Sequence, residues 1–408
     1  MRKGILLVSA VFPPEQVTSA YLNYDLAKAL SADYDVTVLR PRPTRPLGVS
    51  FPDNEWSDPS FKTVLLASYT HPESELGGRL KEAVDFSRKA VDYLDEHHDD
   101  ISFVYNDAWQ LFGYYIVAKA CVKYGIPYMV PIQDIYPECL LTKKRYPGII
   151  KAVIHSLLLP FDRYYQKKAY RVRTISDEMA DYLSRTRKIP RERYLVVNNW
   201  QNDEAFLEEP VWEMESGKRV FAYVGSINVH SNVELIIKAF AEADVPDSVM
   251  YIYGGGNQKE KCRQLVSDLG LENVHFGFVS RTEIPAIQSK AQVLVLALPS
   301  GNGRLCLPSK LTSYLLSGRP VIASVDEDSS TSRIIRGTGC GMTVAPDDVH
   351  ALALAFREMS DKGKGELTQM GERSRSYARE HLTREVNLKR VVEVIDSIFD
   401  NDDKEKEN

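Results

Sequence analysis

The stretch Phe221-Ala-Tyr-Val-Gly225-Ser226-Ile-Asn228 decides the fold. An apolar run ends in a glycine, a polar turn follows, and apolar residues then recur at helical spacing over Val233–Ala243. A strand, a glycine and a helix in this order are typical of a Rossmann-like unit. The stretch therefore predicts the start of a doubly wound sheet.

The alternation of strand and helix continues from this stretch toward the C-terminus. Its expected strands are Arg219–Val224, Ser248–Tyr253, His275–Phe278, Gln292–Ala297 and Pro320–Ala323, and its expected helices are Val233–Ala243, Glu260–Leu269 and Pro308–Ser317. Continuous apolar strands separated by helices indicate a parallel sheet that is covered on both faces. Helical spacing resumes over residues 366–399.

A similar series precedes the acidic stretch at residues 203–217. Its expected strands are Gly4–Ser9, Asp35–Leu39, Lys62–Ala67, Ser102–Tyr105, Pro127–Ile132, Arg171–Ile175 and Tyr194–Val197, and its expected helices are Ser19–Leu30 and Gly113–Tyr124. The sequence thus predicts an α/β protein with two Rossmann-like doubly wound domains, residues 1–203 and 204–375. A helix at residues 376–400 is expected to return to the first domain, and residues 401–408 to form a frayed charged tail. Ligands bind outside the carboxyl ends of such strands, so we expect the site in a cleft between the domains.

Composition is that of a globular protein with no membrane span. The chain has 408 residues, long enough for two domains, with 44% hydrophobic and 26% charged residues and a net charge of −5. Its five cysteines are scattered and lack C-x-x-C spacing, which argues against a disulfide framework or a zinc site and favours a reducing compartment. The apolar start lacks a small-x-small cleavage site and runs into Pro13-Pro14-Glu15, so it is interpreted as a buried strand rather than a signal peptide.

A glycine-rich loop and a short helix suggest a phosphate site. The loop Pro299-Ser-Gly301-Asn302-Gly303-Arg304-Leu305-Cys306-Leu307 precedes a helix that begins near Pro308-Ser309-Lys310. A lysine in the first turn of a helix is unfavourable beside the positive end of the dipole unless an anion compensates it. We therefore predict a pyrophosphate site, with a solvent-facing lysine as the alternative. The glycines at 225 and 254–256 also permit close approach to a phosphate, although simple turns would use them too.

Several short motifs resemble one enzyme family in their order and spacing. They are Phe12–Glu15, Gln133–Glu138, Ile175-Ser176, Asn199-Trp200, Tyr223–Ser226, Gly254–Gly256, Pro308–Lys310 and Ser317–Ala323. Over nearly its whole length the chain resembles the GT-B glycosyltransferases of the large retaining family 4, or group 1, type. It looks closest to the fucosaminyltransferase-like branch of bacterial O-antigen and capsule enzymes.

The resemblance implies transfer of a sugar from a nucleotide donor, with UDP the favoured nucleotide and an N-acetylated amino sugar among the candidate sugars. The acceptor would be a glycan or a polyprenyl-pyrophosphate-linked sugar in surface polysaccharide synthesis. The reaction would be retaining and metal-independent, with no cofactor besides the donor substrate. The enzyme would be cytoplasmic and peripheral at the inner face of the plasma membrane.

The resemblance also implies site residues. The catalytic candidates are Asp134, Glu138, Arg304 and Lys310. The donor-binding candidates are Gly225, Ser226, Asn228, Gly254, Gly255, Phe278, Val279, Asn302, Gly303, Arg304, Leu305, Pro308, Ser309, Lys310 and Ser313. On the acceptor side they are Pro14, Glu15, Thr18, Asn106 and Gln133. Helix capping and turn formation beside Pro137 are the alternative for Asp134 and Glu138.

Departures from the family pattern fall at the charged positions. Where relatives carry an arginine and a lysine that contact the pyrophosphate, this chain has Ser226 and Ser231. Two family glutamates correspond to Asn302 and Lys310, a histidine to Gln133, and two glycines to Val17-Thr18. Our hypothesis is that positive charge is relocated to Arg304 and Lys310, because a pyrophosphate needs a cationic or dipolar partner. These departures keep open a catalytically silent subunit that binds donor or lipid, and a sugar-nucleotide epimerase of the same fold is the other alternative.

A basic segment at residues 143–173 suggests a membrane surface. It holds nine lysines and arginines against one acid, Asp162, with aromatic and aliphatic residues between them. A basic amphipathic helix can lie on an anionic bilayer; a core helix with a solvated basic face is the alternative. Nucleic acid is not an expected partner, because no binding module accompanies the segment. No metal is expected either: Asp33-Tyr-Asp35 is interpreted as a turn, and His97-His98 as a solvated one.

Overall fold

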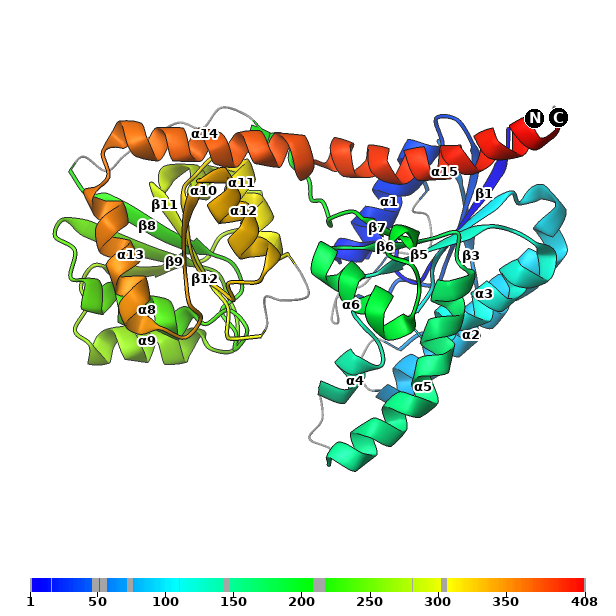
Figure 1. Cartoon of the computed structure of the whole chain (residues 1–408), viewed down its shortest axis with the longest axis horizontal. Helices are drawn as coiled ribbons and strands as arrows, with labels where there is room; N and C mark the ends of the chain where they lie inside the picture. Colours follow the sequence, from blue (N-terminus) through cyan, green and yellow to red (C-terminus); the bar gives the residue numbers. More distant parts are fainter. Residues whose placement is uncertain are drawn as a thin grey trace. The chain divides into compact units, whose positions relative to one another are not determined.

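The computed structural model describes residues 2–15, 17–45, 51, 57–71, 76–109, 111–142, 147–207, 217–280, 282–301 and 307–406. For residues 76, 142 and 401–406 it describes the backbone alone. The chain divides into two compact units, and both appear in Figure 1. Unit 1 comprises Met1–Val197 and Leu388–Asn408, and unit 2 comprises Asn198–Asn387.

Unit 1 is built on a parallel sheet. Within the described residues the sheet has seven strands in the order β3-β2-β1-β4-β5-β6-β7. They are β1 Gly4–Ser9, β2 Asp35–Arg40, β3 Lys62–Leu65, β4 Phe103–Asp107, β5 Tyr128–Ile132, β6 Arg171–Thr174 and β7 Tyr194–Val196. The order of the strands reverses between β1 and β4, which makes this the topological switch point of the unit.

Helices cover the sheet of unit 1 (Figure 1). They are α1 Thr18–Leu30, α2 Leu76–His97, α3 Phe112–Tyr124, α4 Glu138–Thr142, α5 Gly148–Lys168, α6 Asp177–Arg187 and most of α15 Arg384–Lys406. Buried Phe86 of α2, Tyr114 of α3 and Tyr165 of α5 share one apolar core with strand residues such as Val8 and Val130. The N-terminal strand is thus a core strand, as the sequence predicts.

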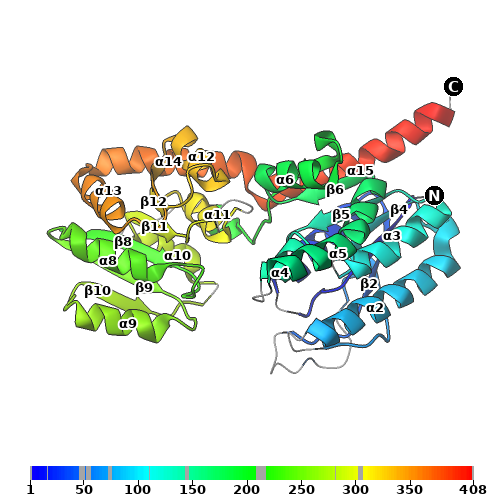
Figure 2. The same cartoon turned by 60° about the horizontal axis from the view of Figure 1, so that its bottom comes forward.

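Unit 2 repeats the design, as Figure 2 shows. Its described strands run in the order β10-β9-β8-β11-β12-β13. They are β8 Arg219–Val224, β9 Ser248–Tyr253, β10 Val274–Gly277, β11 Val293–Ala297, β12 Val321–Ser324 and β13 Gly341–Val344. The helices are α7 Glu204–Leu207, α8 Val233–Ala243, α9 Lys259–Asp268, α10 Ile284–Lys290, α11 Ser309–Leu316, α12 Ser330–Thr338, α13 Val349–Asp361 and α14 Lys364–His381. Side chains of α8, α9 and α13 belong to one apolar core, and those of α10, α11, α12 and α14 to another.

The α/β class with two doubly wound parallel sheets is confirmed. Some details differ from the sequence-based expectation. The strand β13 is missing from it, because all four of its residues are only half-buried at the sheet edge and give no apolar run. The expected helical stretch at residues 366–399 is interrupted between α14 and α15, where the Thr383 hydroxyl accepts a hydrogen bond from the backbone N–H of Val386. The helix α15 then continues to Lys406, so the backbone of residues 401–406 is helical rather than frayed.

Candidate functional site

The candidate site lies at the carboxyl ends of the strands in unit 2. The strand order reverses between β8 and β11, and ligands of such sheets bind in the crevice at this point. Gly225 directly follows β8, and residues 298–301 follow β11. The helix α11 comes next along the chain and begins at Ser309. These segments are the ones in which the sequence places the phosphate site.

The glycines after β8 and β9 allow the two loops to touch through their backbones. Gly254 has a φ of +148°, and a Cβ there would lie 1.9 Å from the carbonyl oxygen of Gly225. A Cβ on Gly256 would lie 2.1 Å from the carbonyl oxygen of Ile227. A hydrogen bond of 2.8 Å from the N–H of Ile227 to the carbonyl of Gly255 joins the same loops. Gly254 and Gly256 are therefore required for the packing of the two loops, whereas a Cβ on Gly255 would meet no neighbouring atom.

Lys310 lies across the end of β8. A Cβ on Gly225 would lie 2.2 Å from Cε of Lys310, so only a glycine leaves room for the lysine stem. The Lys310 ammonium lies 5.5 Å from the centroid of the Tyr223 ring. Burial lowers the pKa of Lys310, and within the described part of unit 2 no carboxylate pairs with it. A half-buried ammonium thus stands in the first turn of α11, at the positive end of the helix, without a described counter-charge.

Ser226 and Ser231, where the resemblance implies an arginine and a lysine in relatives, take part in the turn after β8. The backbone N–H of Asn228 donates to the Ser231 hydroxyl at 2.9 Å, and that hydroxyl donates to the carbonyl of Asn228 at 2.8 Å. Ser231 is buried. The amide of Asn228 donates to the Ser226 hydroxyl at 3.2 Å. Ser231 thus holds the turn together, and its position offers no room for a long cationic side chain without rearrangement.

The loops after β9 and β10 are joined by Lys259. Its ammonium donates to the carbonyl of Gly254 at 2.9 Å and to that of Gly277 at 3.3 Å. Phe278 follows Gly277 and is 81% exposed, whereas Val279 is half-buried. The exposed ring stands at the same sheet edge as Gly225, where it is free to stack on a flat ligand such as a nucleobase.

The remaining donor-side candidates have different surroundings. Pro308 precedes α11, and Ser309 is exposed at its first position. Ser313 is buried in the helix contact with α10, where its hydroxyl accepts from Gln288 at 3.1 Å. The predicted site residues Asn302, Gly303, Arg304 and Leu305 lie outside the described residues.

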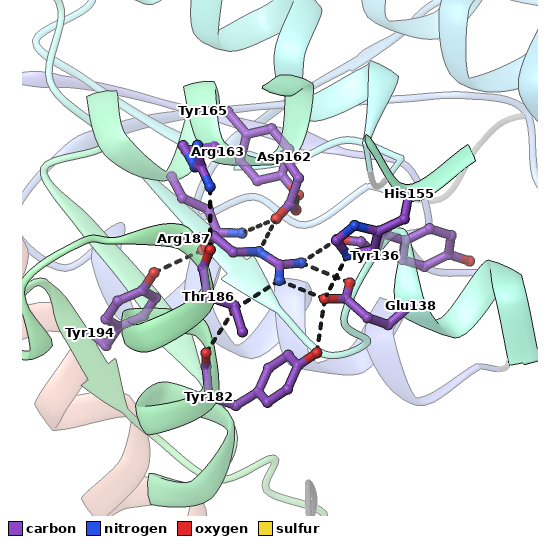
Figure 3. Close-up of polar contacts among 11 residues, drawn as sticks. Tyr136, Glu138, His155, Asp162, Arg163, Tyr165, Tyr182, Thr186, Arg187 and Tyr194 are labelled. Atoms are coloured by element: carbon purple, nitrogen blue, oxygen red, sulfur yellow. Dashed lines mark hydrogen bonds and ion pairs between the residues drawn. The ribbon is translucent and has the colours of Figure 1, made fainter. Parts of the chain in front are cut away.

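Glu138 of unit 1 is half-buried and belongs to a cluster of charges around the buried Arg187, shown in Figure 3. Its Oε1 and Oε2 accept from Nη1 and Nη2 of Arg187 at 2.6 and 2.8 Å. Nε of Arg187 donates to Asp162 at 2.6 Å, and Nη2 also donates to the carbonyl of Tyr136. The Tyr182 hydroxyl donates to Oε1 of Glu138 at 3.0 Å. Burial opposes ionisation of Glu138, but Arg187 outweighs it and lowers its pKa to about 2. The contacts favour a role in fixing α4 to α6 for this carboxylate.

The other predicted residues of unit 1 divide into exposed and buried groups. Asp134 is exposed and Gln133 half-buried just after β5, and Thr18 is exposed at the start of α1. Asn106 is buried at β4, and its amide donates to the carbonyl of Tyr114 at 3.1 Å. Pro14 is half-buried beside Glu15, which follows β1. Asp134 and Thr18 are therefore open to a ligand, whereas Asn106 supports the fold.

Glu15 is buried within a network of charges. Its Oε1 accepts from the backbone N–H groups of Thr44 and Arg45 at 2.7 and 3.1 Å. Arg45 also binds buried Glu82 at 2.9 Å and lies 4.6 Å from the centroid of the Trp109 ring. Desolvation raises the pKa of Glu15, although the hydrogen bonds from Thr44 oppose this.

A polar group at the switch point of unit 1 is missing from the sequence-based site. Asp107 ends β4, and its carboxylate accepts from the amide of Asn23 at 2.6 Å and from the Tyr114 hydroxyl at 3.0 Å. Desolvation raises the pKa of Asp107. The sequence does contain a signal for this group, because Asn23 is the one polar residue on an otherwise apolar face of α1 formed with Leu26, Ala27 and Leu30.

The basic segment separates into an apolar stripe and dispersed charges. On α5, Ile149, Val153 and Leu157 are 81%, 54% and 65% exposed, at helical spacing. Lys167 and Lys168 are exposed, but Arg173 is buried in β6, which corrects the expectation that it contributes to a basic face. Lys143, Lys144 and Arg145 lie outside the described residues.

In the part of the chain that the structure describes, no helix is long and apolar enough to cross a membrane. In the same residues, no three acidic, histidine or cysteine side chains are grouped to hold a metal ion.

Two family models match the two halves of the chain. Residues 19–200 match the glycosyl transferase 4-like domain, and residues 207–381 match the glycosyl transferases of group 1. The boundary between the matches falls near Asn198, where unit 2 begins.

The individual relatives share less than a third of their residues with this chain over the matched regions. The chain is 23% identical to "Probable glycosyltransferase WbjE" of Pseudomonas aeruginosa over 65% of this chain and 67% of the relative. It is 27% identical to the 2-deoxystreptamine N-acetyl-D-glucosaminyltransferase of Streptomyces fradiae, over only 37% of this chain and 38% of that protein.

The fold is that of solved glycosyltransferase structures. The structure of Anabaena Alr3699/HepE in complex with UDP and glucose superposes with a TM-score of 0.65 at 14% identity, over 97% of this chain and 100% of that chain. At such an identity the likeness concerns the fold. Together, the two matched domains and the two doubly wound sheets show that the chain belongs to the GT-B glycosyltransferases that join a glycosyl transferase 4-like domain to a group 1 domain.

Proposed function

We propose that the protein transfers a sugar from a UDP-linked donor to a glycan or polyprenyl-pyrophosphate-linked acceptor in the synthesis of a bacterial surface polysaccharide. The observation that carries the proposal is the ammonium of Lys310, half-buried at the start of α11 without a described acidic partner. A pyrophosphate between β8 and β11 would supply the missing negative charge. UDP is favoured by the UDP complex of the Anabaena structure, and an N-acetylated amino sugar by the name of the Streptomyces relative.

The chemistry assigned to this site is stabilisation of a leaving nucleotide. The bond between the anomeric carbon and the donor phosphate oxygen breaks, and the nucleoside diphosphate departs with the electron pair. A hydroxyl of the acceptor forms the new bond to the anomeric carbon, and its proton passes to the departing phosphate. Lys310 and the N–H groups at the N-terminus of α11 would stabilise the negative charge that develops on the phosphate. This internal displacement would retain the anomeric configuration and require no metal.

We propose in addition that α5 binds an anionic membrane surface, which would bring the enzyme to a lipid-linked acceptor. The exposed stripe of Ile149, Val153 and Leu157 gives an apolar face, and Lys151, Lys167 and Lys168 of the same helix supply positive charge. In Figure 1 the Gly148 end of α5 extends away from the sheet of unit 1. Apolar burial and attraction to anionic headgroups act together in such helices.

The test is thermal unfolding with UDP, GDP, ADP and CMP, each in EDTA and in magnesium, followed by transfer assays with the UDP-sugars. A ligand at about 100 times its Kd adds roughly 2.7 kcal/mol of stability, which raises Tm by several degrees. We expect a UDP-selective rise that persists in EDTA and is absent from Lys310→Ala. No rise with any nucleotide would remove the basis of the proposal.

The two alternative functions, an epimerase and a catalytically silent subunit, predict other outcomes in these assays. An epimerase would convert the nucleotide sugar without an acceptor. A silent subunit would bind nucleotide tightly, with neither hydrolysis nor transfer in the presence of membrane extracts that contain acceptor.

A further inference from the structure

Two strained residues of unit 2 are bonded to each other. Asn232, before α8, has a φ of 41°, and Asp347, after β13, has a φ of 61°. Both lie in the left-handed region, which glycine adopts without strain and other residues adopt at a cost. The amide of Asn232 donates to Oδ1 of Asp347 at 2.7 Å. Asn and Asp are the residues other than glycine that adopt this region most readily, so the hydrogen bond between the two side chains, rather than the backbone conformation, is the informative feature.

The second oxygen of Asp347 reaches the turn after β11. Its Oδ2 accepts from the backbone N–H of Ser300 at 3.1 Å. Asp326, which is buried after β12, accepts from the next N–H, that of Gly301, at 2.8 Å. Two successive N–H groups at the switch point are thus held by carboxylates from the two strands beyond β11. They fix the turn formed by Ser300 and Gly301 directly after β11.

We propose that Asp347 and Asp326 are positioning residues for the donor-binding edge of unit 2. They hold the Ser300–Gly301 turn, which directly follows β11 at the carboxyl edge of the sheet, where Gly225 and Lys310 also lie. This inference rests on the proposed function, because it assumes a nucleotide at that edge. The carboxylate of Asp347 joins three segments: the start of α8, the residues after β13 and the turn after β11.

The substitution Asp347→Gly separates positioning from structure. Glycine relieves the strain at this φ, so the nucleotide-free variant is expected to keep its Tm within about two degrees of wild type. Its affinity for UDP, measured by calorimetry, is expected to fall about tenfold, with KM for the donor rising more than kcat falls. Asp244→Gly is the matched control, because Asp244 also has a positive φ of 42° but lies where α8 ends, at the opposite edge of the sheet. It is expected to leave UDP affinity unchanged.

A second variant, Asn232→Gly, tests whether a loss of UDP affinity comes from the hydrogen bond rather than from a folding defect. Asn232→Gly also relieves strain and removes the amide that holds Oδ1 of Asp347, so it should weaken UDP binding by itself. In a protein that already carries Asp347→Gly, the Asn232→Gly substitution should cause little further loss of UDP affinity. The effects of two residues that act through the same hydrogen bond are not additive. Independent, additive effects would overturn the inference, as would UDP affinity within twofold of wild type in Asp347→Gly. If wild type itself binds no nucleotide, the proposed function fails and this inference fails with it. If wild type binds UDP and Asp347→Gly binds it equally well, the inference alone fails.

Discussion

Arg187 binds both carboxylate oxygens of Glu138 while its Nε binds Asp162. The guanidinium is fully buried at the end of α6, and the two acids come from α4 and α5 (Figure 3). One cation therefore connects three helices that surround the loop after β5. A bidentate pair of this kind fixes geometry as well as charge.

Removing this cation should destabilise unit 1 severely. Arg187→Met leaves Asp162 buried and without its charge partner, which we expect to cost about 3–5 kcal/mol. Arg191→Met is the control, because Arg191 pairs with Asp177 and Asp181 at the surface, where about 0–1 kcal/mol is expected. Urea unfolding followed by circular dichroism measures both. Equal losses in the two variants would show that the buried cluster contributes no more than a surface pair.

Acid should weaken the same cluster through Glu138. Its pKa is lowered from 4.5 to about 2 in the folded protein, so the ionised form is favoured by folding. The resulting stabilisation is complete above about pH 4.5 and is lost as the pH falls toward 2. Glu138→Gln should therefore be less stable than wild type at neutral pH, with the difference shrinking in acid. Tm measured from about pH 3 to 7 tests this, and a difference that stays constant across the range contradicts it.

Lys310→Met should make the nucleotide-free protein more stable and less able to bind. The ammonium is desolvated without a described counter-charge, so an apolar side chain of similar length should raise Tm. The UDP-dependent rise in Tm should disappear at the same time. Stabilisation at the expense of binding is the mark of a functional site. A variant with lower Tm and an intact response to UDP would assign Lys310 to the fold instead.

The pH dependence of UDP binding should report the protonation of Lys310. Burial lowers the pKa of Lys310 below the ordinary 10.5. The site attracts an anion while the amine is protonated, so affinity should be constant at low pH and fall as the pH rises through this pKa. In Lys310→Arg the charge persists to far higher pH, so affinity should fall less than in wild type over the same range, even if it is lower throughout. Calorimetry between about pH 7 and 10 decides; parallel profiles for the two proteins would exclude Lys310 as the titrating group.

The stripe on α5 should bind vesicles that contain phosphatidylglycerol. The double variant Val153→Asp, Leu157→Asp places two acids on the exposed apolar face, and we expect most binding in a sedimentation assay to be lost. Leu354→Asp is the control, because Leu354 is 48% exposed on α13 of unit 2. Wild-type binding should weaken at high salt, since headgroup attraction is screened. Binding that survives the double variant would place the membrane contact elsewhere.

Local patterns predicted the sheets and the donor edge, because apolar runs and strand-end glycines are signals within a few residues. The first-turn position of Lys310 was predicted in the same way. The role of Glu138 could not be, because its partner Arg187 is separated from it by 49 positions and no pattern links the two. Glu15 is similar, since its hydrogen bonds come from Thr44 and Arg45 after the next strand. Long-range pairing decides which of the polar residues at strand ends are free to meet a ligand.

The helix α15 has a consequence for the order in which the protein completes its fold during synthesis. Its residues Val391, Ile395 and Phe399 are buried in unit 1, where the Lys3 ammonium lies 4.5 Å from the centroid of the Phe399 ring. Unit 2 is continuous from Asn198 to Asn387, so all of its residues leave the ribosome before these three. The part of unit 1 that is translated first therefore keeps an uncovered apolar surface until unit 2 and then α15 have been synthesised. Nascent chains stalled before residue 388 should expose this surface to chaperones.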